Sequence, residues 1–219
     1  MFSVDKALPD IGVYTKRLRD KAKSYGKIFE DTYPDINAFS PISNYLVLTL
    51  ELLDYYYRKW WNEEKRQYLR DQDIERIVTI CKWAYINSFS IVEYISKELV
   101  KKKNCSKFAQ SINNRCRKRG WVSFNDILAT SKDKDFGLVD EHEWAVWDSL
   151  KEIRNAIVHN NAIFDRDGKL EYKFDNQPFT VEYKRGKGLI GNMHLGLILV
   201  EILIELYYRW VQKILFLML

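Results

Sequence analysis

The sequence is poor in the residues that interrupt or cross-link a chain. Only 9 glycines and 4 prolines are spread over 219 residues, and this scarcity favours long helices over a sandwich or barrel of many short strands. The 3 cysteines are an odd number and form no CxxC pair, so we expect neither a disulfide framework nor a zinc knuckle. With only 3 scattered histidines, a dedicated transition-metal site is not expected, and we predict no metal and no cofactor.

Signals for secretion and for membrane insertion are also lacking. The first residues show no basic start followed by an apolar run, so we expect a cytoplasmic protein. The stretch 189–219 is strongly apolar, but Glu201, Glu205, Arg209 and Lys213 interrupt it at spacings of four. Since a spanning helix needs about 20 mostly uncharged residues, we interpret this stretch as a core or subunit-interface helix with one charged stripe.

Apolar residues and basic residues are what the chain has in abundance. The apolar fraction is 47%, with 7 Trp, 14 Tyr and 11 Phe, which is enough to build a substantial core. The net charge of +5 conceals a basic segment at 101–119 that contains no acid, so the rest of the chain is mildly acidic. Its cations are Lys101, Lys102, Lys103, Lys107, Arg115, Arg117, Lys118 and Arg119. Such a concentration suits binding to the phosphates of RNA, and a solvated basic loop is the equally open alternative.

The periodicity of the apolar residues predicts an all-α helical bundle with one small β-hairpin before the last helix. Positions with a three-to-four spacing predict helices over 10–30, 41–69, 74–100, 140–160 and 189–219, with shorter helical turns within 101–119 and from Ser123. Between 169 and 184 the period changes to two, with a turn at 175–178, so this stretch is predicted to form the hairpin. We expect residues 1–40 to be a helical extension and 41–219 to be the main domain.

The predicted helix 140–160 begins with Asp140 as an N-cap carboxylate and Glu143 three residues later. The segment that carries chemistry lies near the end of this helix. An arginine and a histidine five residues apart mean little alone, but Arg154 falls within the apolar side of this helix, where a guanidinium is costly unless paired or required by a site. A separate polar stripe, at spacings of four, three and four, is formed by Asp148, Glu152, Asn155 and His159. Arg154 and His159 point about 140° apart on an ideal helix. They can share a site only if the helix ends near His159, or if two copies of the helix meet.

The run Arg154-Asn155-Ala156-Ile157-Val158-His159 resembles the motif of HEPN domains: Arg, usually a polar residue, several further residues, then His, near the end of a long helix. The resemblance covers about 41–219. Residues 1–40 and the basic segment have no counterpart in the family, and the hairpin looks like an insertion. The resemblance implies a metal-independent endoribonuclease, often a toxin or an antiviral-defence effector, whose active site is commonly shared across a homodimer. An antitoxin or a defence-system protein is the partner implied.

The chemistry implied by the resemblance suits these three residues. His159 can exchange a proton with the 2′-hydroxyl or the leaving 5′-oxygen. Arg154 can hold the phosphate with two parallel hydrogen bonds, and Asn155 can orient His159 or donate to the phosphate. A toxin subfamily carries a modified tyrosine two residues after the histidine; here Asn161 occupies that position, so we do not expect that control.

Two alternatives remain open. Arg154 can instead form an interhelical salt bridge while His159 caps the negative end of the helix dipole. The chain would then be a catalytically silent HEPN-like module that binds nucleotide, nucleic acid or a protein partner.

A homodimer is expected on two grounds. The first is the divergence of Arg154 and His159 on one helix. The second is the apolar surface of the last helix, which is larger than one four-helix core needs.

Overall fold

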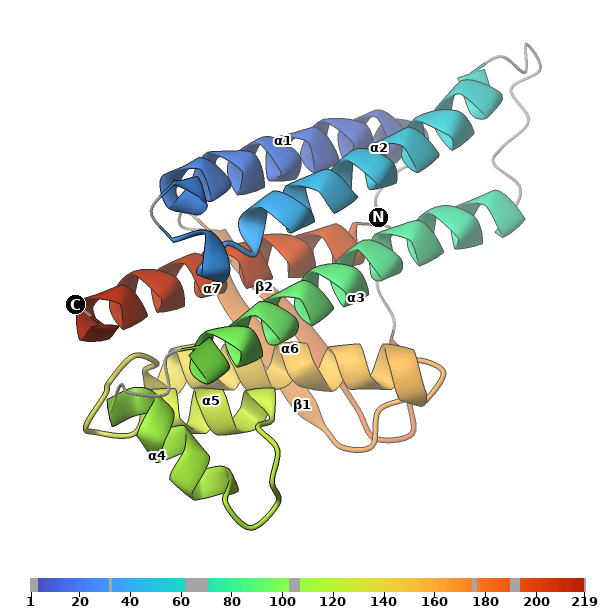
Figure 1. Cartoon of the computed structure of the whole chain (residues 1–219). Helices are drawn as coiled ribbons and strands as arrows, with labels where there is room; N and C mark the ends of the chain where they lie inside the picture. Colours follow the sequence, from blue (N-terminus) through green and yellow to red (C-terminus); the bar gives the residue numbers. More distant parts are fainter. Residues whose placement is uncertain are drawn as a thin grey trace.

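The computed structural model describes residues 4–31, 33–61, 71–102, 107–174, 177–189 and 194–218. Within these residues, 73% of the chain is helical, in seven α-helices, and one two-stranded hairpin precedes the last helix (Figure 1). The elements are α1 (Val4–Glu30), a 3-10 turn (Pro34–Ile36), α2 (Phe39–Trp61), α3 (Asp71–Lys102), α4 (Lys107–Cys116), α5 (Phe124–Lys132), α6 (Glu141–His159), β1 (Gly168–Phe174), β2 (Gln177–Tyr183) and α7 (Leu195–Met218). The predicted all-α class with a small hairpin is therefore confirmed.

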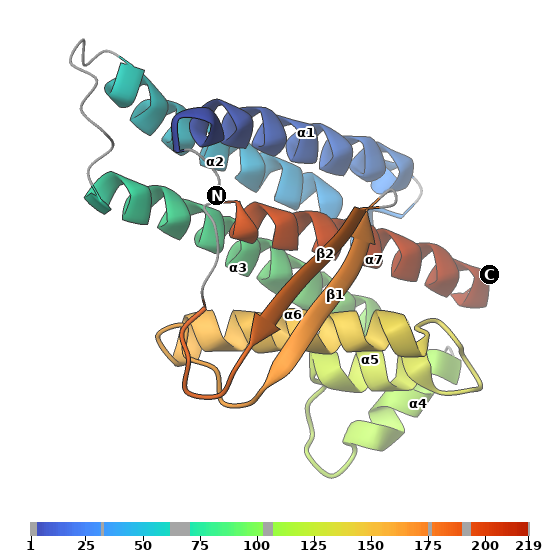
Figure 2. The ribbon, with the colours of Figure 1, turned by 180° about the vertical axis from the view of Figure 1, so that it is seen from behind.

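The helices lie in three layers, which Figure 1 shows from the side. α1 and α2 form an antiparallel pair, α7 and α3 lie beneath them, and α6 forms the third layer with α5 and α4. The hairpin covers the side of α6 and α7 opposite to α3 (Figure 2). The two long faces of the domain are thus different: one is made by α3 with α2, and the other carries the hairpin.

The helix α2 begins earlier than the proline at position 41 predicted. The side-chain oxygen of Asn37 accepts hydrogen bonds from the backbone N–H groups of Phe39 (3.1 Å) and Ser40 (3.2 Å). These contacts satisfy two of the first amides, which have no partner within a helix. The helix therefore begins at Phe39, and Pro41 lies inside its first turn, where a missing N–H costs nothing.

The last helix, α7, is the centre of the core. Its residues Leu197, Leu203 and Val211 are fully buried, and the indole N–H of Trp210 donates to the Ser131 hydroxyl at 2.9 Å. A methyl group on Gly196 would lie 2.2 Å from the Cys81 carbonyl oxygen of α3, so only glycine permits this close approach. Most of the apolar surface of α7 is buried within the chain, whereas Phe216 and Leu217 near its end are 82% and 43% exposed. Within the described ranges, no helix is long and apolar enough to cross a membrane.

The hairpin is anchored to α6 by its first strand. β1 pairs antiparallel with β2, with Leu170 opposite Val181 and Tyr172 opposite Phe179, which confirms the hairpin predicted at 169–184. Leu170 is fully buried and Tyr172 is 6% exposed, as expected for alternate residues of a half-buried strand. The hydroxyl of Ser149 on α6 donates to the Lys169 carbonyl at 3.0 Å. The hairpin then extends away from α6 so that its far end reaches α7 and α1 (Figure 2).

The predicted N-terminal extension, 1–40, contributes helix α1, which packs against α2 and α7. Its residues Ile11, Leu18, Ala22 and Phe29 are at most 2% exposed and belong to the same hydrophobic cluster as the core of α7. Their spacings of seven, four and seven place them on one helix face. Removing this segment would therefore expose the α7 side of the core.

Candidate functional site

The helix α6, which carries the predicted catalytic residues, is fixed at its N-terminus by a capping box. The Asp140 carboxylate accepts from the Glu143 N–H at 2.7 Å, and the Glu143 carboxylate accepts from the Asp140 N–H at 3.3 Å. The pattern of Asp followed three residues later by Glu predicted this start. Lys213 of α7 also donates to Glu143 at 2.9 Å, so the cap is tied to the central helix.

The middle of α6 is anchored by aromatic rings. Trp147 lies against Phe89 of α3 and Phe124 of α5, with ring centroids 6.5 and 5.5 Å away, and those two rings are 5.8 Å apart. The buried phenol of Tyr85 donates to the Leu150 carbonyl at 2.5 Å. Burial raises the pKa of Tyr85 well above its usual range, so the hydroxyl remains a donor. These contacts lock the rotation of α6 against α3.

That rotation turns Arg154 toward α3, where its positive charge is incompletely neutralised. Its Nη1 donates to the Asn155 side-chain oxygen at 3.0 Å, and its Nη2 lies 4.0 Å from Glu93 of α3, itself bound by Lys97 at 2.7 Å. The side chain of Arg154 is 22% exposed. Its Nε is buried and has no hydrogen-bond partner among the described residues. A half-buried guanidinium with donors to spare is costly for stability.

His159 lies at the C-terminal end of α6. It is the last residue of α6, one residue earlier than the predicted end, and its side chain is exposed. Among the described residues, no hydrogen bond or ion pair involves His159. Asn161 and Ala162 follow in the left-handed region, with φ of 51° and 63°, and the Ala162 N–H donates back to the Ala156 carbonyl at 2.8 Å. This reversal ends the helix.

The structure therefore brings together Arg154 and Asn155 but not His159. The Asn155 carboxamide orients the guanidinium rather than the imidazole. The other members of the predicted polar stripe, Asp148 and Glu152, are bound by Arg166 at 2.7 and 3.0 Å. Burial acts to raise the pKa of Asp148, but hydrogen bonds from Lys151 and Arg166 outweigh it and lower the pKa below its usual value. The sequence did not predict this role of Arg166, because it lies beyond the end of the helix.

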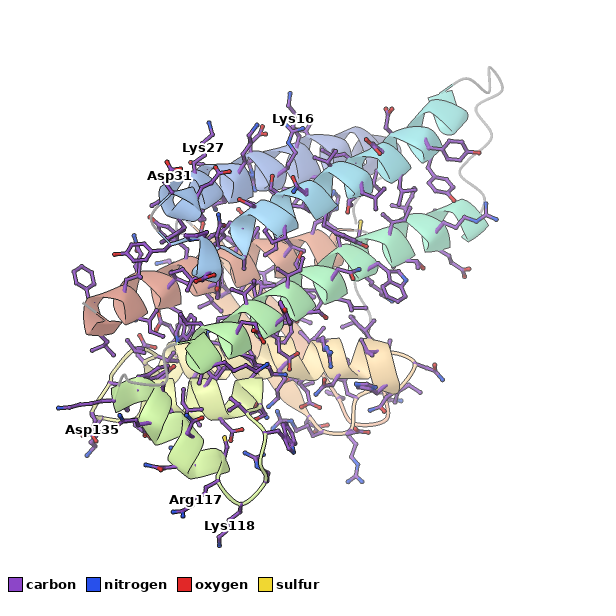
Figure 3. The ribbon with its side chains drawn as sticks, viewed as in Figure 1. Lys16, Lys27, Asp31, Arg117, Lys118 and Asp135 are labelled. Carbon is purple, nitrogen blue, oxygen red and sulfur yellow. The ribbon has the colours of Figure 1, made fainter. Side chains whose placement is uncertain are left out.

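The basic segment divides into paired and unpaired cations. Arg119 donates to Asp126 at 2.5 Å, Arg115 to Asp133 at 2.8 Å and Lys101 to Glu98 at 2.6 Å. Lys107, Arg117 and Lys118 are exposed and have no ion pair among the described residues. Figure 3 shows the last two projecting from the loop after α4, away from the body of the domain. Lys103 and the side chain of Lys102 lie outside the described residues.

The acid that binds Arg119 is itself firmly held. Burial acts to raise the pKa of Asp126, but hydrogen bonds from the Ser123 side chain and backbone and from Arg119 lower it to about 2. Asp126 also closes the capping box of α5 with Ser123. The guanidinium of Arg119 then lies 5.1 Å from the centre of the Trp121 ring, which is 59% exposed. Neither this exposed tryptophan nor its cation was selected as a stacking site from the sequence.

The loop with Arg119 and Trp121 connects α4 to α5. It leads directly into Phe124, whose ring contacts Phe89 and Trp147, and Glu93 follows one turn after Phe89 on α3.

Within the described part of the chain, no group of three His, Cys, Asp or Glu side chains could hold a metal ion.

The chain matches no protein-family model, no curated protein and no solved structure. The candidate site is therefore judged on its own geometry. It offers an under-neutralised arginine, an exposed histidine on another side of the same helix, and a basic loop with an exposed tryptophan. This arrangement can bind a phosphate at Arg154 and transfer protons at His159, but in one chain the two groups do not converge.

Proposed function

We propose that this protein is a metal-independent endoribonuclease of the HEPN type, with Arg154, Asn155 and His159 as its catalytic residues. The observation that carries the proposal is the state of Arg154. Its guanidinium is half-buried, oriented by Asn155, and has an unpaired buried Nε and only a 4.0 Å contact to Glu93. A guanidinium held in this way keeps donors for a phosphate ligand. The role as a toxin or antiviral-defence effector and an antitoxin or defence-system partner rest on the family resemblance alone. The cytoplasmic location rests on the cysteines, which are odd in number and form no CxxC pair.

The proposed reaction is attack of the RNA 2′-oxygen on the adjacent phosphorus. The bond from phosphorus to the 5′-oxygen breaks, and the products carry a 2′,3′-cyclic phosphate and a 5′-hydroxyl. His159 exchanges a proton with the 2′-hydroxyl or with the leaving 5′-oxygen. Arg154 offsets the charge that develops on the phosphate oxygens. The exposed cations Arg117 and Lys118 would guide the RNA backbone toward α6.

The proposed active site needs two copies of the chain. Arg154 faces α3, whereas His159 is exposed at the end of α6 and lies about 140° further round an ideal helix. Val158 and Ile163, which are 42% and 45% exposed, flank His159. Exposed apolar side chains around a catalytic group suit contact with a second copy. In a two-fold dimer, Arg154 of one protomer would face His159 of its partner.

The proposal is tested by RNA cleavage in the presence of EDTA. We expect the unmodified protein to remain active and to leave 2′,3′-cyclic phosphate ends. His159→Ala should lower the rate by about 10²-fold or more, as expected for loss of a general acid–base group. Arg154→Lys should also be inactive, because an ammonium keeps the charge but loses the planar fork. The matched controls are His142→Ala, an exposed histidine in the first turn of α6, and Arg19→Lys on α1; both should cleave normally.

Mixing the two inactive variants separates a shared site from a site within one chain. Arg154→Ala and His159→Ala, refolded together in equal amounts, should recover about a quarter of the parental activity, since half of the dimers would contain one intact composite site. A site within one chain would give no recovery. Folded His159→Ala that cleaves RNA as fast as the parent would refute the catalytic assignment.

A catalytically silent HEPN-like module is the second candidate. It is favoured by the separation of Arg154 from His159 within one chain and by the interhelical contact of Arg154 to Glu93. If the unmodified protein binds RNA but leaves it uncut, with or without EDTA, this candidate replaces the first.

A further inference from the structure

A cavity of about 560 Å³ lies where the far end of the hairpin meets α1 and α7. Its walls are formed by α1 through Tyr14 and Arg17, by the hairpin through Tyr172 and Phe179, and by α7 through Glu201 and Arg209. Figure 2 shows the hairpin crossing to these two helices. A volume of this size lies within the range of small-molecule sites.

The two carboxylates in the cavity are already satisfied. Glu201, 8% exposed, accepts from the Tyr14 hydroxyl, from Arg17 at 3.3 Å and from Lys21 at 3.2 Å. Glu205 accepts from Lys21 and from the Tyr25 hydroxyl. Burial, and then the neighbouring Glu201, raises the pKa of Tyr14 above its usual range, so its phenol stays a donor. A cationic ligand would have to displace these partners, so the carboxylates do not define the ligand.

Arg209 is a cation of this cavity that no carboxylate in the described part of the chain neutralises. Its Nη2 donates to the Tyr172 hydroxyl at 3.2 Å, and its guanidinium lies 6.0 Å from the centre of that ring. Among the described residues it forms no ion pair with a carboxylate. Arg17 adds a second partly available cation, because its side chain is 62% exposed while one nitrogen contacts Glu201. A planar guanidinium held at one nitrogen retains donors for a carboxylate or phosphate.

Aromatic rings of the hairpin form the opposite wall. Tyr172 and Phe179 are directly paired across the strands and therefore project from the same face of the hairpin as Phe174. The Phe174 ring lies 4.8 Å from Tyr172 and 6.2 Å from Phe179. Phe174 and Phe179 are only partly buried, although both lie against the core. Half-buried rings beside an available cation suit a planar group that bears a negative charge.

We propose that this cavity binds a small organic anion with a planar ring, its acidic group held by Arg209 and Arg17 and its ring placed against Phe174 and Phe179. The shared chemistry is that of an aromatic phosphate or carboxylate. This site is separate from the proposed ribonuclease site, because the hairpin and α3 lie on opposite sides of α6 (Figures 1 and 2). The proposal therefore does not depend on cleavage of RNA.

The test is calorimetric titration of the full chain, together with the shift of its thermal unfolding midpoint. Phenyl phosphate and a nucleoside 5′-monophosphate are the ring-bearing anions, inorganic phosphate is the anion without a ring, and benzylamine is the ring with the opposite charge. We expect at least one ring-bearing anion to bind one per chain and to raise the midpoint, and inorganic phosphate to bind about tenfold more weakly. Comparison of phenyl phosphate with the nucleotide distinguishes a simple aromatic anion from a nucleotide.

Variants of the cavity provide the decisive outcomes. Arg209→Met should weaken binding by about tenfold or more, since a charge-assisted hydrogen bond is lost. Arg185→Met, at the opposite end of the hairpin, should bind like the parent. If Arg209→Met unfolds, Tyr172→Phe keeps the ring but removes the hydroxyl that positions Arg209, and binding should weaken. Unchanged affinity in folded Arg209→Met, absence of binding by either ring-bearing anion at millimolar concentration, or preference for benzylamine would overturn the proposal. Equal affinity for inorganic phosphate would overturn its aromatic part.

Discussion

Two charged side chains that face the interior of this domain, the buried Glu201 on α7 and the partly buried Arg154 on α6, have opposite surroundings. Glu201 is contacted by a phenol, a guanidinium and an ammonium group from α1. Arg154 is contacted by one carboxamide and by a carboxylate 4.0 Å away, and its Nε has no partner among the described residues. Both side chains face other helices, with 8% of the Glu201 side chain and 22% of the Arg154 side chain exposed. The difference lies in how fully their hydrogen-bonding groups are used.

The comparison separates a structural charge from one that is available for a ligand. A buried charge with several partners contributes to a unique arrangement of helices and is costly to expose or unpair. A buried charge with unused donors costs stability in the absence of a ligand, and such groups are concentrated at functional sites. By this criterion Glu201 fixes α1 to α7, whereas Arg154 is a candidate for phosphate binding.

The largest expected effect on stability comes from Glu201. Glu201→Ala should lower the free energy of unfolding by about 2 kcal/mol, below the cost for a fully buried pair because Arg17 can turn toward water. Denaturant titration by circular dichroism measures this change. Glu171→Ala, which removes an exposed carboxylate paired to Lys169 on the hairpin, should change it by less than about 0.5 kcal/mol. Equal effects of both substitutions would remove the distinction between structural and surface charges.

A smaller effect is expected in RNA binding. The basic segment, like the interior of the domain, contains charges with ion-pair partners and charges without them. Arg117→Ala combined with Lys118→Ala removes unpaired cations and should weaken binding about tenfold for all RNA sequences. The slope of the logarithm of the binding constant against the logarithm of the salt concentration should become shallower by about 2. Arg115→Ala combined with Arg119→Ala removes cations held by Asp133 and Asp126, so the slope should fall less. Binding titrations at several salt concentrations measure both. Identical slopes for the parent and the first pair would identify the segment as a solvated loop.

Only a small change in stability is expected from substitution of Arg154. Arg154→Met keeps the aliphatic volume and removes an incompletely paired charge, so the free energy of unfolding should change by less than about 1 kcal/mol in either direction. Cleavage, in contrast, should be lost. A destabilisation as large as that of Glu201→Ala would show that the contact of Arg154 to Glu93 is structural, and would support the silent module.

The fold was predictable because local patterns agree with the tertiary arrangement. The spacing of apolar residues located the helices, and the capping box at Asp140 located the start of α6. The change to a period of two located the hairpin. The start of α2 was misplaced, because Pro41 is visible in the sequence while the capping contact of Asn37 depends on the conformation of the preceding turn. The sequence left open how much of the apolar surface of α7 is buried within the chain, because it does not show how many neighbours surround a helix. In the structure most of this surface is buried, and Phe216 and Leu217 remain exposed.

The sequence alone determined that Arg154 and His159 diverge on one helix, because 100° per residue is a property of the backbone. It also determined that Arg154 lies on the apolar side of α6. Only the tertiary structure decided which charges have partners: Tyr14 and Glu201 are 187 residues apart in the chain, and Arg119 is bound by an acid of the next helix. Ion pairs depend on distances of a few ångströms between side chains of different elements, and no local pattern encodes those distances.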